Sequence, residues 1–391
     1  MKKKSLLILL PVLSVSLSGC GPVLKYKDHL SDYVFAMKYH KDFNILQLTD
    51  IHWNMNSSTY ESKIYMDKLL KEVDSHIKTN QGGSAKIDLV ELTGDMFMLS
   101  NTYLVKSFVK YFEEKAAQYG FMYTAIWGNH DRHGIYNPNW LADQFRNAKH
   151  CYYFEPDDDL YGRSNFVINL TDDGTKAGTV KWQLANLDSG ASFSETSLSP
   201  FRDYDYIRKD QTDWWLKEHE LAGGDTVPTI AYYHIPQDEN EAMWQRHVAG
   251  EVLNQKYFKL EGFADNGNEK YASNFIDEAI KHNLKGAFMG HAHNVDWTVE
   301  MEDTETGNKM LLGLGVKTGV ELYYAHIDTK SSDKYMQEGL ASTGITENFD
   351  LIGASLVTLT DAESLIEGKF DLEHLYYNER TSGDFVRWVK W

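Results

Sequence analysis

Residues 43–52 read Phe43-Asn44-Ile45-Leu46-Gln47-Leu48-Thr49-Asp50-Ile51-His52, an apolar run that ends in a polar block. The apolar run has the length of a buried strand, so the polar block begins where that strand would end. Alternate side chains of an extended segment point to the same side, which allows Asp50 and His52 to bind one metal ion together. Taken alone, an Asp-x-His pair is weak evidence for a metal site.

The same arrangement, a predicted strand followed by polar residues, recurs four times further along the chain. The blocks are Thr93-Gly94-Asp95 after residues 87–92, Gly128-Asn129-His130-Asp131 after residues 121–127, His234 after residues 229–233, and Gly290-His291-Ala292-His293 after residues 284–289.

Each of these blocks alone has a structural interpretation. Asp95 is a possible helix N-cap, and the polar turn around Asn129 is a possible capped turn. His234 is a possible structural histidine at a strand end, and the His-x-His pair leaves both interpretations open. In combination the blocks favour a site, because open α/β sheets place their ligands at the carboxyl ends of the strands. The set contains Asp, Asn and His but no thiolate, which suits Mn, Fe, Zn or Mg rather than a structural cysteine–zinc site.

Strand-like and helix-like segments alternate through the first two thirds of the chain. We expect helices at 60–79, 103–119, 208–221 and 273–282, together with strands such as 43–48, 87–92 and 284–289. Residues 165–187 are expected to form strands with a turn at Asp172-Asp173-Gly174. The last third is predicted to be rich in strands, at 296–301, 310–314, 322–327, 356–359 and 385–389. This order predicts one α/β domain over residues 41–391, built around two sheets.

The five blocks, in this order and each after a strand, resemble the signature of the calcineurin-like metallophosphoesterases. The resemblance covers residues 43–293 and implies a four-layer αββα sandwich of two mixed sheets flanked by helices, with a dinuclear metal site at the carboxyl ends of the strands. It also implies hydrolysis of phosphomonoesters or phosphodiesters by a hydroxide that bridges the two metals. Leu187-Asp188-Ser189-Gly190 and the region after His234 further resemble the branch that includes the purple acid phosphatases and a related yeast phosphatase.

The resemblance assigns roles residue by residue. The metal ligands would be Asp50, His52, Asp95 and His293 for the first ion and Asp95, Asn129, His234 and His291 for the second, with Asp95 as the bridge. Both ions would be divalent or of mixed valence, with Mn, Fe and Zn as the candidates. The catalytic residues would be His130, as general acid or oxyanion stabiliser, and Asp131, which either orients His130 or only caps the turn. Met98 stands where purple acid phosphatases carry a tyrosine, so no tyrosinate–iron colour is expected.

The first twenty residues resemble the export signal of a bacterial lipoprotein. Three lysines at Lys2, Lys3 and Lys4 precede an apolar run, which ends in Leu17-Ser18-Gly19-Cys20. We therefore predict a signal peptide at 1–19, a lipid on the thiol of Cys20, a tether at 20–40 and an extracytoplasmic, membrane-anchored protein. A plain signal peptide is the alternative.

The formal net charge of the chain is -18, which argues against a nucleic-acid-binding surface. An acidic protein with a phosphate-ester substrate needs a local source of positive charge, and two metal ions would provide it. A lipid-anchored binding protein that keeps the metals but turns nothing over is the alternative function.

Overall fold

Two eight-stranded β-sheets lie at the centre of the computed structural model, which describes residues 33–54, 58–132, 138–155, 160–191, 204–264, 273–360, 367–379 and 382–390. The first sheet has the order β1-β6-β7-β8-β10-β12-β11-β9. Its strands are β1 (Val34–Lys38), β6 (Phe166–Thr171), β7 (Val180–Asn186), β8 (Thr229–Tyr232), β9 (Gln255–Lys259), β10 (Leu284–Met289), β11 (Val295–Glu302) and β12 (Lys309–Leu314). Strands β7, β8, β10 and β12 are parallel, whereas β11 and β9 are antiparallel to their neighbours.

The second sheet has the order β16-β15-β14-β2-β3-β4-β5, and β13 pairs with β14 at one end. Its strands are β2 (Phe43–Leu48), β3 (Leu89–Leu92), β4 (Met122–Thr124), β5 (Cys151–Tyr152), β13 (His326–Ile327), β14 (Phe349–Leu359), β15 (Phe370–Asn378) and β16 (Asp384–Lys390). Strands β2 to β5 are parallel, and β14 joins them in antiparallel orientation. Both sheets are therefore mixed.

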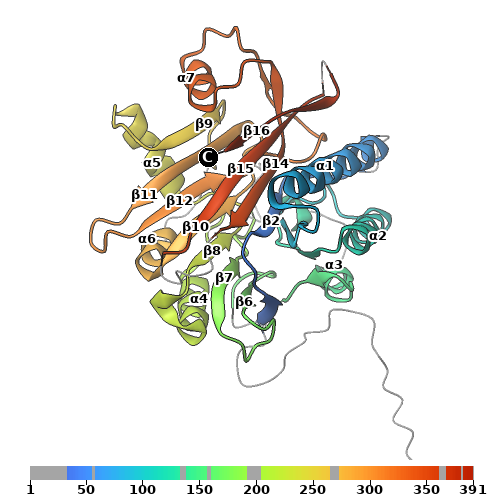
Figure 1. Ribbon diagram of the computed structural model, residues 1–391, viewed down its shortest axis with the longest axis vertical. Helices are drawn as coiled ribbons and strands as arrows, with labels where there is room; N and C mark the ends of the chain where they lie inside the picture. Colours follow the sequence, from blue (N-terminus) through green and yellow to red (C-terminus); the bar gives the residue numbers. More distant parts are fainter. Residues whose placement is uncertain are drawn as a thin grey trace, which may run out of the picture.

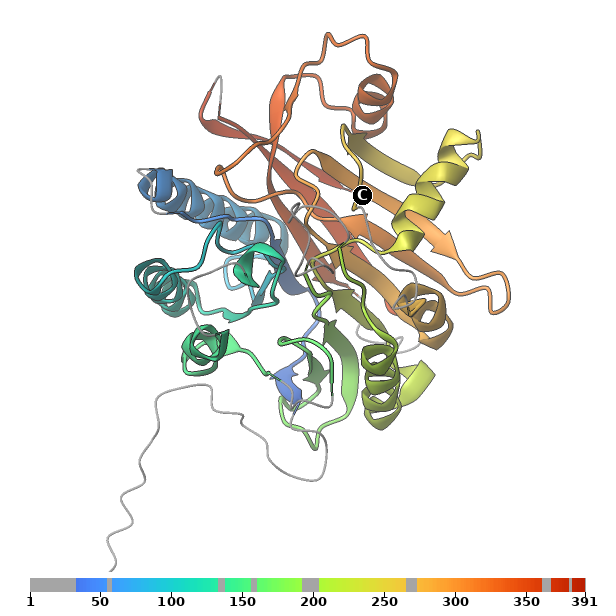
Figure 2. The ribbon, with the colours of Figure 1, turned by 180° about the vertical axis from the view of Figure 1, so that it is seen from behind.

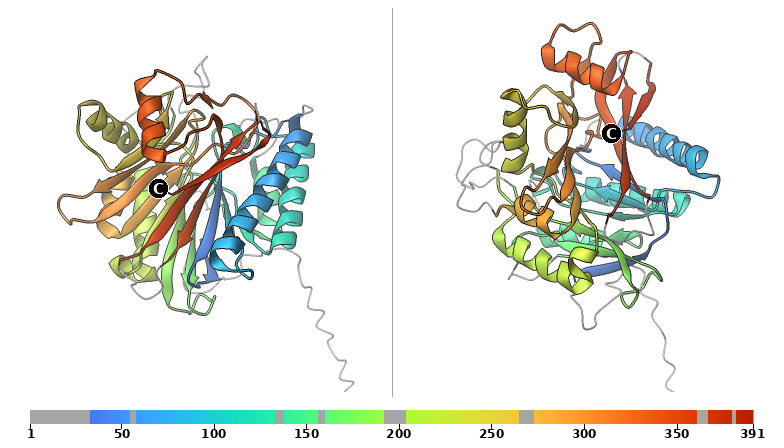
Figure 3. Two further views of the ribbon diagram at one scale, coloured as in Figure 1. Left: turned by 45° about the horizontal axis from the view of Figure 1, so that its top comes forward. Right: turned by 60° about the vertical axis from the view of Figure 1, so that its left-hand side comes forward.

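Helices cover the outer face of each sheet. They are α1 (Ser58–Gln81), α2 (Thr102–Tyr119), α3 (Pro138–Arg146), α4 (Lys209–Ala222), α5 (Asp238–Val248), α6 (Phe275–Ala279) and α7 (Lys334–Thr343). Figures 1 and 2 show α1, α2 and α3 on one side of the molecule and α4, α5 and α6 on the other. In the two further views of Figure 3 the sheets again lie between these helix groups.

Three apolar clusters correspond to the three interfaces of this sandwich. One joins α1, α2 and α3 to the second sheet, and another joins α4, α5 and α6 to the first sheet. The third lies between the sheets and includes Ile45 and Leu89 from one and Ile230 and Phe288 from the other. The predicted fold, two mixed sheets flanked by helices, is confirmed.

Helix α2 shows how local sequence sets the element boundaries. Its N-cap, Asn101, accepts a hydrogen bond from the backbone N–H of Leu104, and Gly120 ends the helix at φ 79° and donates to Ala116 O. Leu104 and Phe108 lie on its buried face, at the spacing of an amphipathic helix. These signals are local, and the prediction of 103–119 differs from the helix by one residue.

Two parts of the sequence-based prediction are wrong. Residues 34–38, placed in the tether, form β1 and pair with β6, so the folded part begins before residue 41. Residues 322–327, predicted as a strand, form one only at His326–Ile327, because Leu322 adopts φ 62°. The predicted signal peptide and Cys20 lie outside the described residues.

Glu91 places a carboxyl group in the interior of the second sheet. Its side chain is fully buried and accepts a hydrogen bond from Thr124 Oγ1. Burial raises the pKa of Glu91 to about 8. The pKa of Glu91 in the folded chain therefore lies above its value of about 4.3 in the unfolded chain. The contribution of Glu91 to stability is complete below about pH 4.3 and is lost as the pH rises to about 8.

We therefore expect the free energy of unfolding to fall by about 1.4 kcal/mol per pH unit between pH 5 and pH 8 because of Glu91. Glu91→Gln should remove this component of the slope, which urea unfolding at several pH values would measure. Glu114→Gln, an exposed substitution on α2, should retain the wild-type slope. Equal slopes for Glu91→Gln and the wild type would contradict the assignment.

Candidate metal centre

The five polar blocks lie at the carboxyl ends of five strands that belong to both sheets. Asp50, Asp95 and the segment of Asn129 follow β2, β3 and β4, whereas His234 and His291 follow β8 and β10. Backbone hydrogen bonds continue past the strand ends, from Asp50 N to Gly94 O at 3.1 Å and from Gly290 N to His234 O at 3.0 Å. The two sheets thus bring residues from distant parts of the chain to one place.

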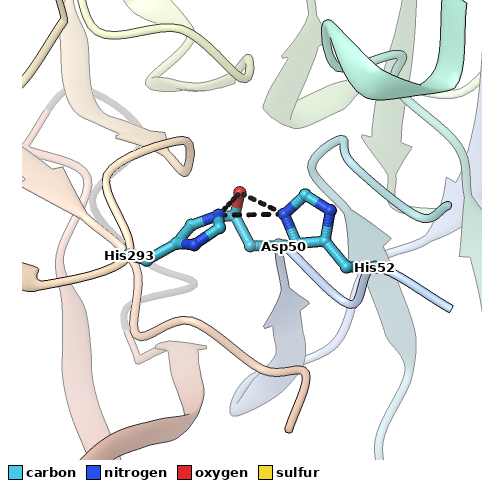
Figure 4. Close-up of side chains that lie close together, drawn as sticks. All are labelled: Asp50, His52 and His293. Carbon is cyan, nitrogen blue, oxygen red and sulfur yellow. Dashed lines mark hydrogen bonds and ion pairs between the residues drawn. The ribbon is translucent and has the colours of Figure 1, made fainter. Parts of the chain in front are cut away.

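Asp50, His52 and His293 form the first group of candidate ligands. Figure 4 shows the two imidazole rings and the carboxylate converging on one point. His52 Nε2 and His293 Nε2 lie 2.9 Å apart, at 3.7 Å and 3.4 Å from Asp50 Oδ1. All three side chains are buried, and Asp50 Oδ1 has no hydrogen-bond partner although its neighbour Oδ2 has two. A buried carboxylate oxygen facing two imidazole nitrogens, without a donor of its own, is suited to bind a cation.

Asp95 joins this group to a second one. Its Oδ2 lies 3.6 Å from His52 Nε2 and 3.3 Å from His234 Nε2. Asn129 Oδ1 lies 3.2 Å from His234 Nε2 and 3.1 Å from His291 Nδ1. The structure therefore brings all seven predicted ligands into one connected cluster, with Asp95 between its two halves.

The backbone is held in an unusual conformation at four of these residues. Asp50, His52, Asp95 and His291 have φ of 52°, 51°, 51° and 78°, in the left-handed region that non-glycine residues seldom adopt. Such conformations persist only where the surrounding structure imposes them, and they are concentrated at functional sites.

Two glycines of the blocks are required by close approach. A Cβ on Gly94 would lie 2.5 Å from the ring of His234, and one on Gly290 would lie 1.9 Å from Thr49 Oγ1. Any side chain at either position would push the two sheets apart at the cluster. The glycines in these blocks thus serve the assembly of the site itself.

Three of the candidate ligands have the protonation states of metal ligands. Burial lowers the pKa of His52 to about 3, and burial together with the charge of His234 lowers that of His291 to about 3. Burial alone would raise the pKa of Asp50, but the close approach of His293 and His52 to its Oδ1 holds that pKa well below the usual range. Neutral imidazoles and an ionised carboxylate are the forms that bind divalent ions.

The ring of His234 is oriented so that its Nε2 is available to bind a metal. Its Nδ1 lies 2.9 Å from the carbonyl oxygen of Thr93, so an Nδ1–H donates there and Nε2 faces Asp95 and Asn129. This backbone contact is the one that commonly fixes the orientation of a metal-binding histidine. Burial opposes protonation of His234, but the charge of Asp95 raises its pKa to about 9.

The two predicted catalytic residues differ in their environment. His130 lines the cavity above the cluster, with its Nδ1 3.2 Å from Met98 O and its backbone N–H donating to Asp95 Oδ1 at 2.8 Å. Asp131 is buried and accepts from the backbone N–H groups of Phe97 and Gly128 at 3.1 Å and 2.9 Å. Of the two roles predicted for Asp131, the structure shows the contacts of the capping role, because backbone N–H groups donate to both of its oxygens.

Arg132 follows in the same segment and does not face the cluster. Its guanidinium binds both carboxylate oxygens of the buried Asp188 and lies over the ring of Trp127. This pairing anchors the segment that carries Asn129 and His130.

Three residues near the cluster were missed in the sequence analysis. The buried Lys317 donates to Asp50 O at 2.7 Å, and the rings of Tyr204 and Tyr323 lie 4.3 Å from His291 and 4.7 Å from His293. Lys317 lies three residues beyond the end of β12, where a polar block could have been sought, whereas Tyr204 and Tyr323 follow no such pattern.

The calcineurin-like phosphoesterase family model matches residues 43–295, which is more than half of the chain. The chain belongs to this family. The matched range includes all five blocks and ends just beyond His293. As in other members of the calcineurin-like phosphoesterase family, divalent metal binding is expected, and the Asp and His groups described above are placed to hold a metal.

Among curated proteins, the chain is similar to the probable inactive purple acid phosphatase 28 of Arabidopsis thaliana, with 23% identity over 285 residues. That match spans 65% of this chain and 66% of the relative. Among solved structures, it is similar to a calcineurin-like phosphoesterase of Bacillus subtilis, at 12% identity and a TM-score of 0.38 over 90% of this chain and 89% of that one. The plant relative agrees with the resemblance to the purple acid phosphatase branch.

Lys317 is expected to support metal binding without being a ligand. Its ammonium holds the carbonyl oxygen of Asp50, at a residue whose backbone is in the left-handed region. Lys317→Met removes this contact at similar side-chain volume, and we expect about 10- to 100-fold weaker metal binding. Competition with a chromophoric chelator would measure it. Lys309→Met, at an exposed lysine that pairs with Glu300, is the control, and unchanged affinity in Lys317→Met would contradict the role.

Proposed function

We propose that this calcineurin-like phosphoesterase hydrolyses phosphate esters at a dinuclear metal centre. The observation that carries the proposal is the convergence of seven candidate ligands from five strand ends, with Asp95 between the two groups. A cavity of about 850 Å³ opens above them and is lined by Asp95, Asn129, His130, His291 and His293. A volume of this size is typical of small-molecule sites.

The residues divide naturally between two ions. Asp50, His52, Asp95 and His293 would hold the first, and Asp95, Asn129, His234 and His291 the second. Bound divalent ions supply an activated water nucleophile and polarise the phosphoryl group. The nitrogen and oxygen ligand set suits Mn, Fe or Zn.

With two ions bound, the net charge at the metal centre would favour an anionic substrate. Two divalent ions carry four positive charges, and Asp50 and Asp95 offset two of them. The remaining positive charge would attract a phosphate to a protein whose formal net charge is -18. His130, at the cavity wall, is placed to donate a proton to the leaving oxygen.

The test is turnover by the purified chain after removal of metals and reloading with Mn²⁺, Zn²⁺ or Mg²⁺. Nitrophenyl phosphate and bis-nitrophenyl phosphate distinguish monoester from diester hydrolysis. We expect metal-dependent release of nitrophenol, which His291→Ala abolishes and His282→Gln, at an exposed histidine paired with Asp225, retains.

A second candidate function is metal-dependent binding without turnover. It is considered because the plant relative is named a probable inactive phosphatase. Metal binding in a stoichiometric amount with no hydrolysis of either ester would favour this second function. If the purified chain bound no metal at all, both functions would be excluded.

We also propose that Cys20 carries a lipid anchor on an extracytoplasmic protein. The proposal is supported by the sequence of residues 1–20. No helix among the described residues is both long and apolar enough to span a bilayer. Mass spectrometry of the cell-derived protein should find a new N-terminus at Cys20 with an acyl-bearing modification, and an unmodified Cys20 would contradict the anchor.

A further inference from the structure

The outer part of the cavity above the candidate metal centre has a distinctive chemical character, and the inference from it rests on the proposed function. Beyond the candidate ligands, the lining includes three aromatic rings and two carboxylates: Tyr204, Phe263, Tyr323, Glu241 and Glu261. Among the described residues that line the cavity there is no lysine and no arginine. Any part of a substrate that extends from the phosphate would contact this surface.

The aromatic rings stand next to the candidate ligands. Tyr204 meets His291 edge to face at 4.3 Å, and Tyr323 lies 4.7 Å from His293. Tyr323 is 57% exposed, and its neighbour Leu322 has φ 62° with 39% of its surface exposed. A β-carbon makes the left-handed region unfavourable for leucine, and residues held in this conformation are concentrated at functional sites.

The two carboxylates are held in place by neutral donors. Glu261 accepts from the backbone and side-chain N–H groups of Asn294 at 2.9 Å and 3.1 Å, and Glu241 accepts from Gln245 Nε2 at 2.5 Å. Burial and then the charge of Glu261 raise the pKa of Tyr323 to about 12, so its phenol is neutral near pH 7.

Lys259 interacts electrostatically with both carboxylates, but its ammonium is already engaged. Its ammonium donates to Glu261 O at 2.7 Å and lies 4.4 Å from the ring centroid of Phe263. Even when Lys259 is counted against Glu241 and Glu261, one formal negative charge remains. The outer cavity is therefore aromatic and anionic, whereas the candidate metal centre below it would be cationic.

We infer that the substrate is a phosphate ester whose alcohol part carries an ammonium group. The phosphate would bind at the metal centre, and the ammonium would lie among the tyrosine rings and the two glutamates. Aromatic faces attract cations, most strongly where water is excluded, and the carboxylates add direct charge attraction. A nucleotide or a polyphosphate would instead bring further negative charge against Glu241 and Glu261.

The test compares esters that differ in one atom. Phosphocholine and 3,3-dimethylbutyl phosphate have the same shape, because carbon replaces the quaternary nitrogen, and their nitrophenyl diesters form a second matched pair. We expect the metal-loaded chain to prefer the cationic member of a pair by about tenfold or more in kcat/KM. The matching ethanolamine esters show whether the substrate carries a trimethylammonium or a primary ammonium group. Preference for either cationic ester over the neutral ester supports the inference.

The charge-neutral variant Glu241→Gln/Glu261→Gln should lower the preference ratio toward one, since each amide keeps one acceptor oxygen but carries no charge, and only the aromatic rings still favour the cation. Glu114→Gln, on the opposite side of the molecule, should keep the wild-type ratio.

Equal hydrolysis of the cationic and neutral esters by the wild type would overturn the inference and leave phosphoesterase activity standing. Absence of hydrolysis of every ester would contradict the proposed function instead. In that event calorimetry still tests the inference, by comparing the affinities for phosphocholine and its neutral analogue. We expect phosphocholine to bind at least tenfold more tightly, and equal affinities would overturn the inference.

Discussion

Asp95→Asn is expected to lower kcat/KM for phosphate-ester hydrolysis at least about a thousandfold, which corresponds to roughly 4 kcal/mol of transition-state stabilisation. Asp95 is the residue between the two groups of ligands, at 3.3 Å from His234 and 3.6 Å from His52. Asparagine keeps the size of the side chain but offers only one oxygen and no charge. The second metal should therefore be lost or displaced.

Mass spectrometry would measure the loss of metal, and turnover at saturating Mn²⁺ would measure the loss of activity. Asp213→Asn, at an exposed carboxylate on α4 paired with Lys209, is the matched control and should behave as the wild type. A variant at Asp95 that keeps two metals and more than a tenth of the activity would exclude Asp95 as the bridge.

His130→Gln is the second substitution with a large expected effect, about a hundredfold or more in kcat on an ester with an alkyl leaving group. His130 lines the cavity, and its contacts to Met98 and Asp95 hold it beside the cluster. An alkoxide leaving group needs a proton, whereas nitrophenolate leaves readily without one. A loss confined to the alkyl ester would therefore identify His130 as the general acid.

His130 also lies close enough to His52 and Asp95 to join a metal site, and the same variant separates the two roles. If His130 were a ligand, His130→Gln would lose metal and would lose activity on the alkyl and nitrophenyl esters alike. His282→Gln controls for the loss of a histidine from the chain. Full activity of His130→Gln on the alkyl ester would exclude both roles.

The sequence predicted those parts of the site that follow from local rules. Asp50 and His291 could each be placed at the edge of a sheet because an apolar strand precedes each of them, although the two strands belong to different sheets. Strand 284–289 was predicted with the bounds of β10, which ends in the buried apolar residues Ala287, Phe288 and Met289 directly before the polar block.

What escaped prediction depends on contacts between distant residues. Lys317 lies 267 positions from Asp50 in the chain, and nothing in its neighbourhood marks a buried ammonium. The residues at 322–325 have the composition of a strand, but the positive φ of Leu322 breaks the pattern and brings Tyr323 to the cavity. Asp131 had two equally reasonable roles, and only the positions of the Phe97 and Gly128 N–H groups decided between them.

The left-handed backbone at Asp50, His52, Asp95 and His291 has a consequence for how such a protein changes over generations. Each of these residues costs the fold on the order of 1 kcal/mol compared with glycine, and the buried charges add to that cost when no metal is bound. Mutations that replace a candidate ligand would therefore be neutral or favourable for stability. In descendants of this protein that were no longer selected for metal binding, we expect the ligands to be lost before the fold.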